Sequence, residues 1–230
     1  MIGRRARASL AVCAIVAAAG AFSHGAAFAR ERERADAAPR WWLAIEPFAG
    51  SVRLDPHLGD YLWNVEPRLV WGGQLVAHRG GAGVGARVWR ASTAQSSGIP
   101  GESIEPSVRL TAAELVGEWR LLSAWGVGVA AVASGGRLHV GYAPDRATFV
   151  PPGSSVAVEV AYEPIDAWTG GAGLALRRPI AARLALGARV ERSFFALDTA
   201  HRNGESIETR RETFANWSAR LELSWRLPLG

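Results

Sequence analysis

The histidines are the side chains best suited to acid–base chemistry, and the sequence scatters them. His57 and His201 fall in stretches rich in Asp, Gly and Asn, where solvated loop residues are the usual interpretation. His78 and His139 fall in segments of alternating polarity, and His78 is expected to be structural. Catalysis requires a nucleophile, a base and an orienting group brought together, and no motif joins them here. No catalytic residues are therefore predicted.

Metal and cofactor chemistry also lacks a pattern. Cys13 is the single cysteine, no two histidines stand at helical or strand spacing, and no loop is densely acidic. Pairs of glycines are frequent, but none follows a strand and opens a helix as a phosphate-binding loop does. We expect neither a metal nor a cofactor.

Arginine and glutamate supply the remaining chemistry. The formal net charge is +5, and three of these charges lie in the first 29 residues, so the rest of the chain carries +2. The two signs are interspersed rather than gathered into a basic stripe, which argues against nucleic-acid binding. Charged residues of opposite sign on one face of a sheet could instead pair with each other away from water.

The elements that position these charges are β-strands. From Ala215 to Leu227 small and apolar residues alternate strictly with polar ones, so a slip of one residue would exchange the two faces. Runs of this kind predict eight strands. The predicted strands are 41–53, 62–78, 82–93, 106–121, 124–141, 156–177, 181–195 and 211–228.

The connections between these runs alternate between short and long. The long ones, 54–61, 94–105, 142–155 and 196–210, are rich in Asp, Pro, Gly, Ser and His. Short turns at one end and long loops at the other are typical of outer-membrane barrels. Gly135-Gly136 and Pro164 weaken the pattern over 134–168, where either the strands project beyond the membrane or the loop is longer.

The N-terminus predicts export. Three arginines precede an apolar run from Leu10 to Phe22, and Ala27-Phe28-Ala29 offers a small-x-small cleavage site. We expect a signal peptide at 1–29, a flexible leader at 30–40 and a barrel at 41–230.

Alternation alone also fits a soluble β-sandwich, in which the apolar face would be internal. Three features favour the inverted arrangement of a membrane barrel: apolar stripes long enough to cross a bilayer, tryptophans near strand ends, and a face that mixes glycine with paired charges. The predicted lumenal charges are Glu46, Glu66, Arg68, Arg87, Glu114, Glu118, Arg120, Arg177, Arg189, Glu191, Arg220 and Glu222. The predicted membrane-interface aromatics are Trp41, Trp42, Trp71, Trp119, Trp125, Trp168 and Trp225.

In these traits, and in glycine-rich hairpins such as Thr169–Pro179, the chain resembles the small outer-membrane β-barrel proteins, including the OmpA-type transmembrane domain. The resemblance implies an all-β, eight-stranded antiparallel up-and-down transmembrane barrel with both termini in the periplasm. One departure is that members typically end on an aromatic residue, whereas the last aromatic here is Trp225.

The resemblance implies location and fold rather than an activity. We expect a non-enzymatic outer-membrane barrel with a structural, adhesive or barrier role and a lumen closed by Arg/Glu pairs. The alternatives are a narrow channel or carrier for small molecules, and a lipid-modifying barrel enzyme, although no His-x-Ser element stands here. The expected partners are outer-membrane lipid and lipopolysaccharide, and the barrel insertion machinery during biogenesis.

Overall fold

The computed structural model describes residues 41–96, 105–150, 155–203 and 206–229. The predicted signal peptide and leader lie outside the described residues, as does most of the predicted loop at 94–105. Among the residues described, no helix is long and apolar enough to cross a membrane.

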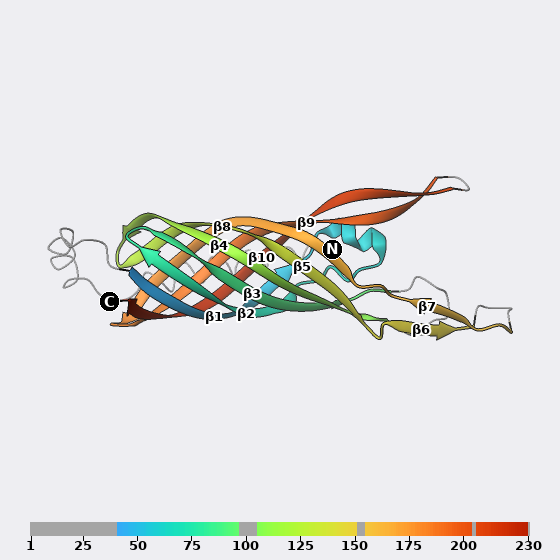
Figure 1. Ribbon diagram of the computed structural model, residues 1–230, viewed down its shortest axis with the longest axis horizontal. Coiled ribbons are helices and arrows are strands. Elements are labelled where there is room, and N and C mark those ends of the chain that lie inside the picture. Colours follow the sequence, from blue (N-terminus) through green and yellow to red (C-terminus); the bar gives the residue numbers. More distant parts are fainter. Residues whose placement is uncertain (1–40, 97–104, 151–154, 204–205, 230) are drawn as a thin grey trace, which may run out of the picture. The chain divides into compact units, whose positions relative to one another are not determined.

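Eight long antiparallel strands close into a barrel (Figure 1). They run in the ring order β1-β10-β9-β8-β5-β4-β3-β2, which confirms the predicted fold class. Their bounds are β1 Trp41–Arg53, β2 Arg68–Arg79, β3 Ala82–Ala94, β4 Ser107–Ala124, β5 Val127–Ala143, β8 Ile165–Ala181, β9 Leu184–Asn203 and β10 Ser206–Leu229.

The strand register fixes how far the barrel is staggered. Paired residues followed once round the ring from Arg53, beginning with Trp217 on β10, lead back to β1 at Leu43, ten residues earlier. Such a stagger tilts every strand against the barrel axis, and eight strands leave an interior that side chains just fill.

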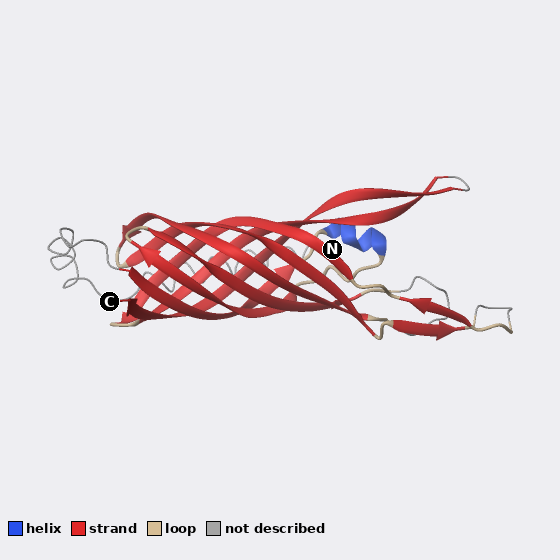
Figure 2. Ribbon diagram, viewed as in Figure 1, coloured by secondary structure: helices blue, strands red, loops and turns tan. Residues whose placement is uncertain are grey.

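Short turns join the strands at one end of the barrel. Trp125 and Gly126 connect β4 to β5, and both have positive φ angles, 52° and 74°, which the tightest hairpin turns require. β1 begins and β10 ends at this same end, because Trp41 pairs both with Leu229 and with Arg79, the last residue of β2 before its short turn to β3. The long connections lie at the opposite end (Figure 2), which we call the loop end.

The loop end carries most of the departures from the predicted strands. Residues 62–67 are not part of β2, which begins at Arg68. They belong to the connection from β1, which also contains a short helix, η1 (Pro56–Tyr61). Residues 156–164 do not belong to the barrel either: β7 (Val158–Ala161) pairs only with β6 (Arg146–Phe149) in a separate hairpin. The loop predicted at 142–155 is therefore longer than its predicted bounds. A longer loop was one of the two alternatives for this region.

The predicted loop at 196–210 is wrong. β9 and β10 continue through it as a two-stranded ribbon, paired from Phe195 with Phe214 to Asn203 with Ser206. β8 pairs with β9 only as far as Phe195, so the ribbon extends beyond the barrel wall (Figure 1).

Glycine permits close strand contact inside the barrel. Gly135-Gly136 does not interrupt β5, which runs unbroken from Val127 to Ala143. A Cβ on Gly136 would lie 2.0 Å from the backbone oxygen of Ala113 on β4, so no other residue fits without moving that strand. Glycine here is a packing requirement rather than a strand breaker.

Candidate functional site

The barrel lumen holds the greatest concentration of buried polar side chains among the residues described. Alternation along the strands turns every second side chain inward, and the inward set differs along the axis. Paired charges occupy the part nearer the short turns, and apolar side chains occupy the part nearer the loop end. We call these parts the charged network and the apolar plug.

Glu191 on β9 is the hub of the half of the charged network that lies nearer the apolar plug. Arg87 binds both of its carboxylate oxygens, at 2.7 and 2.6 Å, and Ser134 donates to it at 2.7 Å. Arg220 also pairs with Glu191, so one carboxylate joins strands β3, β5 and β10. Arg87 reaches further to Glu114 at 2.6 Å.

Glu118 on β4 is the hub of the half of the charged network that lies nearer the short turns. Its carboxylate pairs with Arg177 and Arg189, each at 2.5 Å. Arg189 also binds Glu222 at 2.6 Å, and Arg177 binds Glu46 at 2.8 Å. Gln74 donates to Glu46 as well.

Burial makes this network decisive for stability. The side chains of Arg87, Glu118 and Arg189 are at most 2% exposed, so each has lost nearly all contact with solvent. Desolvating an ion is costly, and only partners with good geometry offset that cost. Removal of one member leaves its former partners buried and charged with less opposite charge around them, a larger penalty than the lost attraction alone.

The network ends near the short turns on an aromatic stack. Trp42 lies flat against His78, with ring centroids 4.0 Å apart, and the Arg226 guanidinium lies 5.0 Å from the Trp42 ring. The placement of Trp42 at the membrane interface is therefore wrong. Trp41 and Trp42 are consecutive on one strand, so only one of them can face outward.

The apolar plug fills the loop end of the lumen. It consists of buried side chains from the strands together with Leu54, Leu58 and Trp63 from the segment that contains η1. The strand residues are Val52, Val70, Ala91, Val108, Leu110, Ala112, Leu138, Val140, Ala167, Phe195, Leu197 and Phe214. The first connecting segment thus folds back into the barrel mouth, and the sequence did not predict this.

Asp55 holds that segment in place. The β1–β10 ladder stops at Arg53 and Trp217, and beyond it the Asp55 carboxylate accepts from the backbone of Ala215 at 2.7 Å. The Asp55 backbone donates to Asn216 at 3.0 Å. Burial alone would raise the pKa of Asp55, but hydrogen bonds from the backbone of Ala215 and His57 lower it below its ordinary value. The Asp55 carboxylate is therefore ionised at neutral pH.

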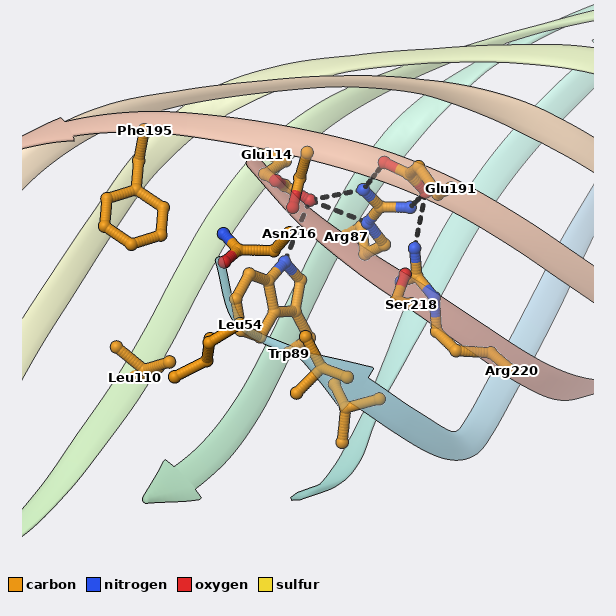
Figure 3. A pocket seen from close by; sticks show the side chains of 13 residues that line it. Leu54, Arg87, Trp89, Leu110, Glu114, Glu191, Phe195, Asn216, Ser218 and Arg220 are labelled. Carbon is orange, nitrogen blue, oxygen red and sulfur yellow. Dashed lines mark hydrogen bonds and ion pairs between the residues drawn. The ribbon is translucent and has the colours of Figure 1, made fainter. Parts of the chain in front are cut away.

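A small recess of about 20 Å³, partly open to solvent, lies where the plug meets the network (Figure 3). Leu54, Leu110 and Phe195 line one side, and the Arg87–Glu191 pair lines the other. The Trp89 indole nitrogen bridges the two by donating to Glu114 at 3.1 Å. The charged groups that line the recess are already ion-paired, so it does not indicate a charged ligand.

The structure places nine of the twelve predicted lumenal charges in the network: Glu46, Arg87, Glu114, Glu118, Arg177, Arg189, Glu191, Arg220 and Glu222. Glu66 is exposed and precedes β2, and Arg120 is exposed near the short turns, so both lie outside it. Arg68 is half-buried at the start of β2 and makes none of the network's ion pairs. Sequence reasoning missed Gln74, Ser134 and Trp89, although all three fall on the inward face of their strands.

The outer wall of the barrel carries an apolar belt. Its exposed residues come from seven of the eight barrel strands, and Leu115 is 71% exposed. They are Ile45, Leu75, Val84, Val88, Leu115, Leu174, Leu176, Leu186, Val190, Leu221 and Leu223. Exposed tryptophans lie toward both ends of the belt: Trp41, Trp119, Trp125 and Trp225 near the short turns, and Trp71, Trp168 and Trp217 toward the loop end. Trp217 was not among the predicted interface aromatics.

The histidine side chains that the structure describes lie on three separate elements: His57 on η1, His78 on β2 and His139 on β5. His57 is exposed and bonds Asp55 at 2.9 Å, and His139 bonds Asp166 at 2.9 Å on the outer surface. His201 lies in β9 rather than in a loop. Over the described ranges, no group of three or more His, Cys, Asp or Glu side chains could hold a metal ion.

No protein-family model and no curated protein matches the chain. Solved structures of similar fold include Neisserial surface protein A, at 6% identity and a TM-score of 0.47, with 84% of this chain and 100% of that chain covered. They also include the outer membrane protein AlkL, at 13% identity and 0.49, covering 91% and 96%. A third is the outer membrane protease OmpT from Escherichia coli, at 8% identity and 0.35, covering 83% and 97%. At identities of 13% or lower and TM-scores below 0.5, these likenesses carry no argument about activity.

Proposed function

We propose that the chain is an outer-membrane barrel with a closed lumen and a structural, adhesive or barrier role at the cell surface. The observation that carries this proposal is the inverted polarity of the barrel, with charged residues buried inside and an apolar belt exposed outside. A soluble sheet would bury the apolar face, because apolar surface in water is unfavourable. In a bilayer the same belt meets hydrocarbon, and the closed ladder leaves no unpaired strand edge in the barrel wall.

The lumen is closed at two levels. The charged network spans it on the short-turn side, and the apolar plug fills it on the loop side. An ion would have to displace paired charges and then cross an apolar layer, which is costly. This arrangement supports a barrier or scaffold role over the channel alternative.

The segments at the loop end are the parts that such a barrel would expose at the cell surface. The β9–β10 ribbon and the β6–β7 hairpin pair with no other part of the barrel wall. With an even number of strands the start of β1 and the end of β10 fall on the short-turn side, which we assign to the periplasm. The ribbon and hairpin would then face the exterior, where an adhesive or shielding role needs them.

The closed lumen predicts that the protein conducts no ions across a planar bilayer. Purified protein inserted at a potential of about 100 mV should give no discrete current steps, because the network and plug leave no continuous aqueous path. A general porin, inserted in the same bilayer, serves as the positive control. Regular steps from the wild-type protein would contradict the proposal and favour the channel alternative.

A further inference from the structure

Five arginines face outward at the loop end of the apolar belt, and we call them the arginine collar: Arg53, Arg90, Arg109, Arg137 and Arg192. Each is exposed, and each comes from a different barrel strand. Within the described residues none of the five forms an ion pair with a carboxylate, unlike the arginines of the ribbon and hairpin. The collar is thus a set of uncompensated positive charges.

The collar is ordered by tryptophans. Arg53 and Arg192 lie directly opposite Trp217 on its two neighbouring strands. In the same way Arg90 is the cross-strand partner of Trp71. Three of the five collar arginines therefore have an exposed tryptophan as their direct cross-strand neighbour.

The geometry of these pairs favours a fixed cation at the surface. The Arg137 guanidinium lies 4.0 Å from the ring centroid of its cross-strand partner Trp168, and that of Arg192 lies 5.6 Å from the Trp217 ring. Cation–π contact of this kind holds the charge against the protein without neutralising it. A planar guanidinium held in this way still offers donors for bidentate bonding to a phosphate.

We propose that the arginine collar binds the phosphate groups of anionic lipids in the leaflet that surrounds the loop end. This inference rests on the membrane placement proposed above. Tryptophans of this kind settle at the level of lipid headgroups, where hydrocarbon gives way to water. Arginines paired with them are then at phosphate height, on several sides of the barrel. A glycolipid that carries phosphate monoesters supplies the complementary charge.

A titration with lipid in detergent tests the proposal. The folded full chain in non-ionic micelles is titrated with fluorescent diphosphoryl lipid A, and energy transfer from tryptophan to the fluorophore reports binding. The same fluorophore on phosphatidylcholine measures insertion without net charge. Soluble polyphosphate measures free phosphate binding. We expect tight binding only for the phosphorylated glycolipid.

The decisive variant replaces Arg53, Arg90, Arg137 and Arg192 with glutamine and keeps every tryptophan. Its affinity for the phosphorylated glycolipid should fall by roughly six-hundredfold, because each arginine at an anionic surface contributes roughly fivefold. If this variant does not fold, the pair Arg53→Gln and Arg192→Gln should still lose about twentyfold on the same reasoning. The matched control is Arg79→Gln, which removes an arginine 5.6 Å from the Trp41 ring at the short-turn end. It should retain wild-type affinity.

Three outcomes overturn the proposal. They are unchanged affinity in the collar variant, an equal loss in the Arg79→Gln control, and binding of soluble polyphosphate as tight as that of the lipid. Each of these results leaves the closed-barrel proposal standing, provided that the protein still shows the heat-dependent gel shift of a folded barrel. Absence of that shift in the wild-type protein would count against the closed barrel itself.

Discussion

Alanine in place of Glu118 is expected to lower the free energy of unfolding by about 3–5 kcal/mol, the usual cost of breaking a buried ion pair from one side. Glu118 binds both Arg177 and Arg189 at 2.5 Å. Both guanidinium groups would keep their charge in a site with little water. Urea unfolding of the protein in phosphatidylcholine vesicles measures the change.

Two further variants separate charge from packing. Glu118→Gln keeps the shape of the side chain and removes its charge, so most of the loss should remain. Glu66→Ala makes the same chemical change at an exposed acid outside the lumen, and its effect should stay within about 0.5 kcal/mol. If Glu118→Ala were no more harmful than Glu66→Ala, the charged network would not stabilise the barrel.

Arginine in place of Leu115 is expected to destabilise the folded barrel in vesicles by about 2–4 kcal/mol, the cost of arginine near the middle of a bilayer. Leu115 is 71% exposed, and its cross-strand partner Ala86 is exposed as well. On a soluble protein such a position would tolerate arginine almost freely, because both side chains would meet water. The same urea titration in vesicles gives the result.

Val158→Arg is the matched control for this prediction. Val158 is also an exposed apolar residue on a strand, but it lies in the β6–β7 hairpin outside the barrel wall. Its replacement should change stability by less than about 0.5 kcal/mol. Equal effects of the two substitutions would show that the belt does not contact lipid.

Much of the barrel could be predicted because its lumen and outer wall demand opposite residue types. Strict alternation in β10 and β9 placed Arg189, Glu191 and Arg220 inward before any contact was known. Pairing could not be predicted, since Glu191 is joined to Arg87 across 104 positions of the sequence. Partners so distant depend on the stagger of the barrel, which no local pattern encodes.

The errors lie where alternation loses its meaning. Both faces of the β9–β10 ribbon carry polar residues where described, as at Asp198 and Thr199, so the sequence looked like a loop. The helix η1 has six residues, too few to show helical periodicity. Glu66 fits the alternation of β2 but precedes its first residue, Arg68, so its prediction as a lumenal charge is wrong. The apolar plug was missed because apolar residues near the loop end face both inward and outward.

Electrophoresis of membrane fractions before and after heating tests the central claim, a membrane-spanning closed barrel, most directly. A folded barrel resists detergent at room temperature and migrates as a compact species, and boiling unfolds it. We predict that the protein is recovered with the outer membrane and that its apparent size changes on boiling. Recovery in the periplasmic fraction without detergent, or a single band that boiling does not shift, would contradict the account.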